Sequence, residues 1–349
     1  MTDPLTDPTT PRSTLDPHAR VVVLAGGLSH ERDVSLRSGR RVAEALRDAG
    51  VTVDERDVDA TLLPALTADR PDVVLPVLHG ETGEDGALRE VLELLGIPYV
   101  GAQPAACRVA FDKPVAKAVA ARAGLHTPDS VALPHETFRE LGAATVMRAI
   151  AERLGLPLIV KPAKSGSALG CTVVHDAEAL PGAMVNAFAY GDTALVERFV
   201  AGTEVAVPVV DTGDGPRALP AVEIRPDGGV YDYTARYTAG STEFLVPAKL
   251  SDELAAECAR VAVAAHEALG LRDLSRSDLI VDADGVVWFL EVNVAPGLTE
   301  TSTVPLAVHA AGLELGTLVR ELLGAAVARH VSGDTPQNTP DHLDAPAGG

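Results

Sequence analysis

The sequence predicts a mixed α/β protein of two or three domains that begins with an open parallel sheet. Three patterns support this fold class: strands alternate with helices over residues 21–95, a strand–loop–strand unit follows at 158–174, and two apolar runs flank an Asp-Gly pair within 274–297. Alternating strands and helices are typical of parallel sheets, whereas an Asp-Gly turn between apolar runs predicts an antiparallel hairpin. A chain of 349 residues, 46% hydrophobic and 22% charged, is long enough for several cores.

The first predicted domain covers residues 20–112. Residues 21–24 read as a buried strand, residues 35–49 as a helix, residues 51–55 and 73–77 as further strands, and the segments near Leu62 and at 87–95 as helices. Ligands of such sheets bind in loops beyond the carboxyl ends of the strands, where Glu31 and His79 both lie. The chain has neither a GxGxxG nor a GxxxxGK[ST] motif, so phosphates must be bound in another way.

The second predicted domain covers residues 113–202. Its Lys113-Pro114 pair suits a first helical turn, and residues 158–162 and 171–174 read as strands around a loop of small residues. Backbone N–H groups of such a loop can cover a phosphate chain without a P-loop lysine. A plain hairpin turn is the alternative, and the nearby Lys161 and Lys164 favour the phosphate lid.

The third predicted domain, residues 203–330, contains the hairpin. Side chains alternate along a strand, so Arg276 and Asp278 share a face, as do Glu291 and Asn293. A connecting loop of two or four residues would bring all four together. Asp278, Glu291 and Asn293 would then offer the oxygen ligands that Mg²⁺ prefers. A solvated hairpin face carries the same residue types, so this pattern alone leaves metal binding open.

Other segments of the third domain are less specific. Residues 251–269 and 313–329 read as helices. The polar, tyrosine-containing residues 231–247 suit an active-site lid or, equally, a surface loop with packed tyrosines.

Composition narrows the class of protein. The net charge of −20 argues against nucleic-acid or anionic-membrane partners. The first residues have no basic or apolar targeting segment, so we expect a cytoplasmic protein. Three separated cysteines fit buried thiols, and residues 1–19 and 331–349 have the composition of disordered tails.

Five motifs, in order along residues 20–323, resemble the D-alanine–D-alanine ligase family of ATP-grasp enzymes. They are Gly26-Gly27-Leu-Ser29-His-Glu31 with Ser35-Leu-Arg-Ser38-Gly39, His79-Gly80-Glu-Thr-Gly83-Glu84-Asp85-Gly86, Lys161-Pro-Ala-Lys164-Ser165-Gly166-Ser167-Ala168-Leu-Gly170, Tyr231-Asp232-Tyr233-Thr-Ala-Arg236-Tyr237, and Glu291-Val-Asn293-Val-Ala-Pro296-Gly297-Leu-Thr-Glu-Thr-Ser302.

The resemblance implies a two-part ATP-grasp fold after the N-terminal domain. It also implies a homodimeric enzyme that uses ATP and two Mg²⁺ ions, with Mn²⁺ as an alternative. Such an enzyme phosphorylates the carboxylate of one D-alanine and lets the amine of a second attack the acyl phosphate. The product, D-alanyl-D-alanine, is a peptidoglycan precursor.

The resemblance also assigns roles to individual residues. It implies catalytic roles for Glu31, Ser167, Tyr237, Arg276 and Gly297. It implies nucleotide contacts for Lys113, Lys161, Ser165, Gly166, Glu197 and Glu204, substrate contacts for His79, Arg236 and Ser302, and metal ligation by Asp278, Glu291 and Asn293.

Several positions depart from the family pattern and leave the second substrate open. Ala168 replaces a usual serine, Arg236 a usual lysine, Val294-Ala295 a Thr-containing pair and Arg89-Glu90 a Gln-Gly pair, while Glu300 adds a carboxylate near Ser302. A ligase for D-serine, D-lactate or an L-amino acid is therefore an alternative, and a non-catalytic nucleotide-binding relative is a second one. In this family a hydroxyl at Tyr237 goes with an amine as second substrate.

Overall fold

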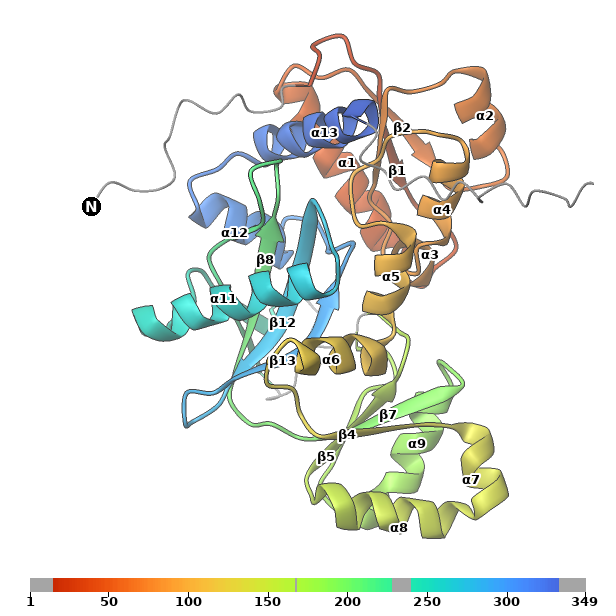
Figure 1. Ribbon diagram of the computed structural model, residues 1–349, viewed down its shortest axis with the longest axis vertical. Coiled ribbons are helices and arrows are strands. Elements are labelled where there is room, and N and C mark those ends of the chain that lie inside the picture. Colours follow the sequence, from red (N-terminus) through yellow and green to blue (C-terminus); the bar gives the residue numbers. More distant parts are fainter. Residues whose placement is uncertain (1–14, 167, 228–239, 333–349) are drawn as a thin grey trace, which may run out of the picture.

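The computed structural model describes residues 15–166, 168–227 and 240–332, and in them the strands form three sheets (Figure 1). The N-terminal sheet is parallel, in the order β2 (Val53–Asp57), β1 (Val21–Ala25) and β3 (Val73–Pro76). The predicted strand–helix alternation is confirmed by α1 (Arg32–Asp48), α2 (Leu62–Ala68), α3 (Glu81–Glu84) and α4 (Ala87–Leu94). Every residue of β1 is buried, as expected of an apolar run in a parallel sheet.

The end of the described chain returns to this first sheet. Helix α13 (Leu315–Ser332) packs against α1 and β3, and lies beside α1 in Figure 1. A Cβ on Gly316 would overlap the carbonyl oxygen of Ala45, so the two helices approach closely where α13 has no side chain. Leu15 and Ala19, within the predicted N-terminal tail, are buried in the same core, so packing begins before Arg20.

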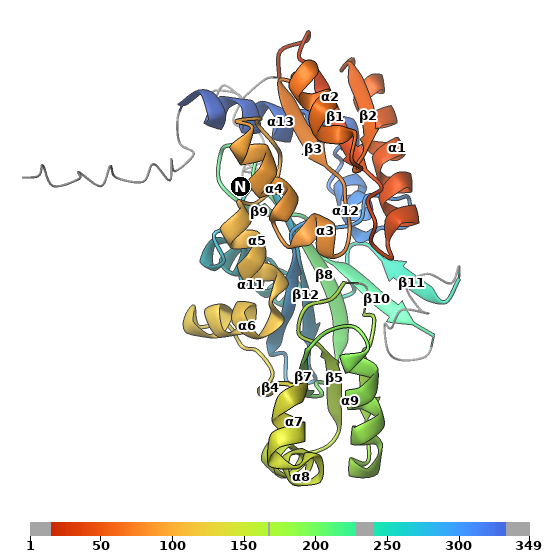
Figure 2. The same cartoon turned by 90° about the vertical axis from the view of Figure 1, so that its right-hand side faces the viewer.

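The middle sheet is antiparallel, in the order β4 (Ser130–Pro134), β7 (Thr193–Arg198), β5 (Leu158–Pro162) and β6 (Thr172–Val174). Helices α7 (His135–Leu141), α8 (Ala143–Leu154) and α9 (Leu180–Phe188) accompany it, with the short 3₁₀ helix Ala177–Ala179 (Figure 2). The direct antiparallel pairing of β5 with β6 confirms the predicted strand–loop–strand unit.

The third sheet has six strands. Its main path is β11 (Thr242–Leu245), β10 (Val222–Pro226), β8 (Thr203–Val210), β12 (Leu274–Val281) and β13 (Val287–Asn293), with β9 (Arg217–Ala218) on β8. Helices α5 (Pro104–Phe111), α6 (Lys113–Arg122), α11 (Asp252–Ala268) and α12 (Thr303–Ala310) complete this part. Ala116 and Ala120 of α6 share a core with Val205 and Phe289, so the helix that opens with Lys113 packs on the third sheet.

The predicted hairpin is present, but its register arises differently from the expectation. Residues 282–286 form a five-residue connection, not one of two or four, and the Asp282 carboxylate holds it by accepting the N–H groups of Asp284 and Val286. Near the turn Ile280 therefore pairs with Trp288. A β-bulge between Asp278 and Leu279 then shifts the register by one residue, and from there on Asp278 faces Glu291.

None of the described helices is long and apolar enough to cross a membrane.

Candidate active site

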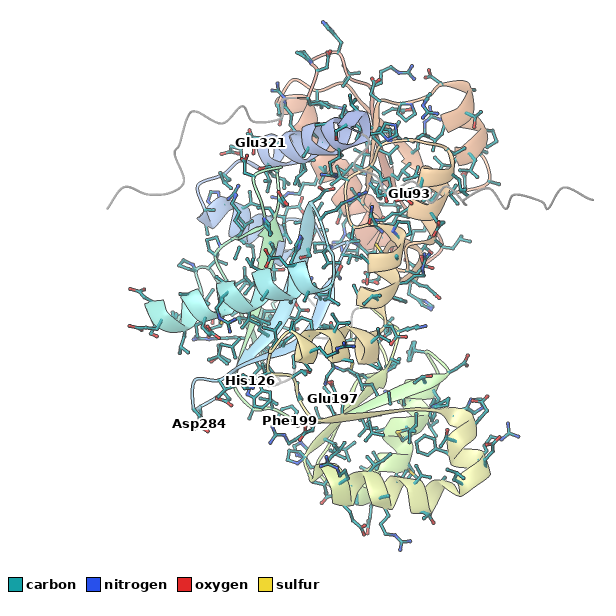
Figure 3. The ribbon with its side chains drawn as sticks, viewed as in Figure 1. Glu93, His126, Glu197, Phe199, Asp284 and Glu321 are labelled. Carbon is teal, nitrogen blue, oxygen red and sulfur yellow. The ribbon has the colours of Figure 1, made fainter. Side chains whose placement is uncertain are left out.

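A cavity of about 510 Å³ lies between the middle sheet and the third sheet. Figure 3 places Glu197 and Phe199, which both line it, where these two sheets meet. The lining also includes Lys113, Lys161, Ser165, Glu204, Glu223, Asp278 and Glu291. Residues that are far apart in the sequence thus come together, and most of them are among those predicted to contact nucleotide or metal.

Glu197 is held by two lysines. Its carboxylate, 1% exposed, pairs with Lys117 through one oxygen and with Lys161 through the other, and Lys117 also donates to the carbonyl of Pro128 at 2.8 Å. Burial lowers the pKa of Lys161, opposed by the nearby charge of Glu291. Burial also lowers the pKa of Lys117, to about 6, whereas its ion pair with the Glu197 carboxylate favours the charged ammonium. Of these two lysines, Lys161 lines the cavity.

Lys113 ties the loop over the cavity to the third sheet. Its ammonium donates to the carbonyl of Ser165 at 2.6 Å and lies 3.5 Å from the Glu291 carboxylate. It is held at the start of α6, where the side chain of Asp112 caps the helix by accepting from Val115 N–H.

The same loop reaches the N-terminal domain at Glu31. A Cβ on Gly166 would lie 2.7 Å from the Glu31 carboxylate, and a Cβ on Gly80 would lie 2.8 Å from it. Glu31 is 8% exposed, so a carboxylate is enclosed where three loops meet. The absence of side chains at both glycines is what allows this approach.

His79 makes hydrogen bonds through both ring nitrogens. Nδ1 lies 2.8 Å from the carbonyl oxygen of Ala295, and Nε2 lies 3.0 Å from the hydroxyl of Ser38. Burial lowers the pKa of His79, which favours the neutral ring. His79 therefore supports the loop that contains Ala295, and its role as a substrate contact stays a prediction.

Arg276, Asp278, Glu291 and Asn293 lie together on the hairpin, because Arg276 pairs with Asn293 and Asp278 with Glu291 across the two strands. Arg276 forms a bidentate pair with Asp278, with both donor–acceptor distances 2.7 Å. Asn293 pairs with Arg276 across the strands, and its side-chain oxygen accepts the N–H of Ala295 at 2.8 Å.

The donor set suits a hard cation. Asp278 and Glu291 supply carboxylates and Asn293 an amide oxygen, which are ligands that Mg²⁺ takes together with water and phosphate oxygens. Within the described ranges no three His, Cys, Asp or Glu residues are grouped for a metal. A cation held by these two carboxylates and one amide would need further oxygen ligands, from water or phosphate.

The loop after the hairpin brings Gly297 and Ser302 together. The Ser302 hydroxyl lies 2.7 Å from where a Cβ on Gly297 would be, and the N–H of Thr299 donates to that hydroxyl at 3.1 Å. Ser302 precedes α12 directly. Of the other predicted site residues, Ser167, Arg236 and Tyr237 lie outside the described residues.

Sequence reasoning missed several residues of this region. Lys117 lies one helical turn after Lys113 in a chain with only five lysines. This scarcity and spacing could have indicated that Lys117 lies near the same site. Glu223 lines the cavity, where its buried carboxylate accepts the N–H of Lys249 at 2.8 Å, and nothing in its sequence context marked it. Ser38 and Glu84 lie within matched motifs but received no role.

Two family models match this chain. The family model described as "D-ala D-ala ligase C-terminus" matches residues 119–324, and the one described as "D-ala D-ala ligase N-terminus" matches residues 54–102. A D-alanine–D-alanine ligase of Bordetella petrii is 41% identical over 321 residues, 92% of this chain and 96% of the relative. One of Ectopseudomonas mendocina is 41% identical over 317 residues, 90% of this chain and 97% of the relative.

Solved structures with the same fold include two related ligases. The D-Ala:D-Ser ligase VanG from Enterococcus faecalis has a TM-score of 0.77 and 28% identity, covering 88% of this chain and 99% of its own. The D-alanine–D-alanine ligase from Bacillus anthracis, complexed with ATP, has a TM-score of 0.75 and 27% identity, covering 90% of this chain and 99% of its own.

Proposed function

Because the chain belongs to the D-alanine–D-alanine ligase family, we propose that it joins two D-alanine molecules at the expense of ATP, giving D-alanyl-D-alanine, ADP and phosphate. The observation that carries the proposal is 41% identity to such a ligase over 92% of the chain. The cavity between the middle and third sheets, with Lys113 and Lys161 in its wall, supports a nucleotide site there.

The nucleotide enters between the two sheets. Lys113 and Lys161 face the phosphates, and the backbone of Ser165 and Gly166 covers them, as in other loops of small residues. Glu197 and Glu204 line the same cavity, which supports the proposed contacts of Glu197 with the base and of Glu204 with the ribose. Since phosphoryl transfer depends mainly on positioning and charge neutralisation, this clustering of cations is what the reaction requires.

The metal ligands are the two carboxylates and the amide of the hairpin. Asp278, Glu291 and Asn293 would hold Mg²⁺, which when bound neutralises phosphate charge. Arg276, which forms a bidentate pair with Asp278, would face negative charge on the transferred phosphoryl group.

The first D-alanine is held with its ammonium at Glu31 and its carboxylate toward the γ-phosphate. An oxygen of that carboxylate attacks phosphorus, ADP leaves, and an acyl phosphate forms. Enclosure of Glu31 by the loop at Gly166 limits access of water, which would hydrolyse this intermediate.

The second D-alanine attacks with its neutral amine, its carboxylate held by Ser302. A tetrahedral intermediate forms and collapses as the carbon–oxygen bond to phosphate breaks, and the departing phosphate takes up the proton that the amine nitrogen loses. The N–H of Gly297 would donate to the developing oxyanion, and one such donor typically lowers a barrier by about 3 kcal/mol.

A second candidate function is ligation of D-alanine to D-serine. It is favoured by the fold similarity to VanG, whereas the curated relatives at about 40% identity favour D-alanine. The departures from the family pattern at Ala168, Arg236 and Glu300 bear on the second substrate, so the product has to be identified by experiment.

The test is phosphate release from Mg·ATP by the purified protein with D-alanine alone, then with D-serine, D-lactate or L-alanine added, with products identified by mass. We expect D-alanine-dependent release and D-alanyl-D-alanine as the main product. A different main product would show that the second substrate is not D-alanine. Absence of phosphate release with every substrate would support a non-catalytic nucleotide-binding relative.

The matched variant is Glu291→Gln, which preserves side-chain size but removes one negative charge from the metal ligands. We expect ligation to fall by a factor of about 100 or more while ATP binding, measured by calorimetry, is retained. Full activity in this variant would contradict the metal assignment.

We further propose a homodimer located in the cytoplasm, where the product supplies peptidoglycan synthesis. Light scattering after size-exclusion chromatography tests the dimer, and a monomeric mass would refute it.

A further inference from the structure

The segment that carries Gly297 is held from another domain by two buried contacts. The carbonyl oxygen of Ala295, two residues before Gly297, lies 2.8 Å from His79 Nδ1, and the N–H of Leu298, one residue after it, donates to the Ser38 hydroxyl at 3.2 Å. Ser38 belongs to α1 and His79 to the loop after β3. The two contacts therefore bracket Gly297.

The direction of each hydrogen bond follows from the chemistry of the partners. A carbonyl oxygen only accepts, so His79 carries its hydrogen on Nδ1. In the neutral ring Nε2 is then an acceptor, and it takes the hydroxyl hydrogen of Ser38 at 3.0 Å. Ser38 thus accepts from Leu298 and donates to His79, which uses its hydrogen-bonding capacity in one consistent arrangement.

Burial makes this arrangement rigid. Ser38 is fully buried, His79 is 4% exposed and Leu298 is 5% exposed. A buried hydroxyl or ring nitrogen that lost its partner would have no water in exchange, so alternative arrangements are costly. The N–H of Ala295 is fixed as well, by the side-chain oxygen of Asn293.

We propose that Ser38 is a positioning residue, which acts through His79 and Leu298 to hold the Gly297 N–H where the reacting carbonyl develops charge. The inference rests on the proposed ligase function. Ser38 is not among the residues that line the cavity and contacts His79 and Leu298 instead, so its effect on the reaction is indirect.

The test compares Ser38→Ala with Ser35→Ala. Ser35 lies one turn earlier on α1 and is equally buried; its hydroxyl donates to the carbonyl of Val77 at 2.6 Å and accepts the N–H of Gly26 at 2.8 Å. It therefore loses a similar pair of hydrogen bonds, but none that reaches residues 295–298. Both variants should therefore show the loss of stability that follows from removing a buried hydroxyl. Only Ser38→Ala should also show the effect of a displaced Gly297 N–H.

We expect kcat to fall by about 10- to 100-fold in Ser38→Ala, with the KM for ATP changed by less than about 3-fold, because misplacement of a catalytic group lowers the rate without removing the nucleotide site. In Ser35→Ala we expect kcat to stay within about 3-fold of the original value. Ser38→Cys, which nearly keeps the volume and a weak donor, should recover part of the rate. It also replaces Ser38→Ala if that variant does not fold.

A second readout does not depend on activity. The imidazole ¹⁵N resonances of His79, assigned by their loss in His79→Gln, should indicate a neutral ring protonated at Nδ1. In Ser38→Ala the Nε2 resonance should shift, and in Ser35→Ala it should not.

The two proposals fail separately. Absence of ligation by the unaltered protein would refute the ligase function, while the ¹⁵N comparison would still test the contacts of Ser38. An unchanged kcat together with an unchanged His79 spectrum in Ser38→Ala would overturn the positioning role.

Discussion

Replacement of Glu84 by glutamine should make the protein more stable at neutral pH. Glu84 ends α3 and is 6% exposed, and its carboxylate accepts the N–H of Gly80 at 3.0 Å. Burial, with a smaller contribution from the negative charge of Glu31, raises the pKa of Glu84 from 4.5 to about 8. The folded protein therefore keeps a proton that the unfolded chain loses.

The size of the effect follows from proton linkage. Between pH 4.5 and 8 the folded state binds about one more proton than the unfolded state, so the free energy of unfolding decreases by about 1.4 kcal/mol per pH unit as pH rises. This contribution is fully present below pH 4.5 and is lost by pH 8. At pH 7 the accumulated loss is about 3 kcal/mol.

Glutamine is neutral throughout and still offers an oxygen to the N–H of Gly80. We expect urea unfolding, followed by circular dichroism, to give similar stabilities for Glu84→Gln and the original protein near pH 4.5. At pH 7 the variant should be about 3 kcal/mol more stable. Glu81→Gln, at an exposed position of the same helix, is the control, and its pH dependence should follow that of the original. Parallel curves for Glu84→Gln and the original between pH 5 and 8 would refute the reasoning.

Three other substitutions test the packing around the cavity. Gly166→Ala should raise the KM for D-alanine about 10-fold in initial-rate assays, since its Cβ would lie 2.7 Å from the Glu31 carboxylate; an unchanged KM would contradict this contact. Lys117→Met removes one of the two lysines that pair with the buried Glu197 carboxylate. It should lower the free energy of unfolding, measured with denaturant, by about 3 kcal/mol and weaken ATP binding in calorimetry. An unchanged ATP affinity would show that Lys117 does not contribute to the nucleotide site. Gly316→Ala should destabilise by about 2 kcal/mol because its Cβ overlaps α1 backbone, and a variant as stable as the original would refute that packing.

Sequence reasoning predicted the local elements well. Alternation of apolar strands with helices, the strand–loop–strand unit of β5 and β6 and the polar face of the hairpin all follow from periods of two and 3.6 and from turn residues. The hairpin also shows how a correct result can rest on an incorrect step. Asp278 does face Glu291, but only because a bulge compensates for a loop of five residues, and bulges have no reliable signal in a single sequence.

Contacts between distant segments were not predictable in this way. That α6 packs on the third sheet depends on which apolar faces meet, and its small alanines suit more than one partner. Ser38 is a serine on a helix like many others, and its contact with Leu298, 260 residues later, exists only after two domains are assembled. Lys117 was visible as a scarce residue type, whereas its pairing with Glu197 needed the fold of the middle sheet.

The return of α13 to the first sheet bears on how the chain is made. Side chains of β1 and β3 share a core with Leu318 and Leu322, which are synthesised about 300 residues after β1 and about 240 residues after β3. Domains usually fold in order as they leave the ribosome, beginning at the N-terminus. Here the earliest sheet must wait, with part of its apolar surface uncovered, until α13 emerges. Emergence of α13 from the ribosome should therefore be the step at which this domain becomes resistant to protease.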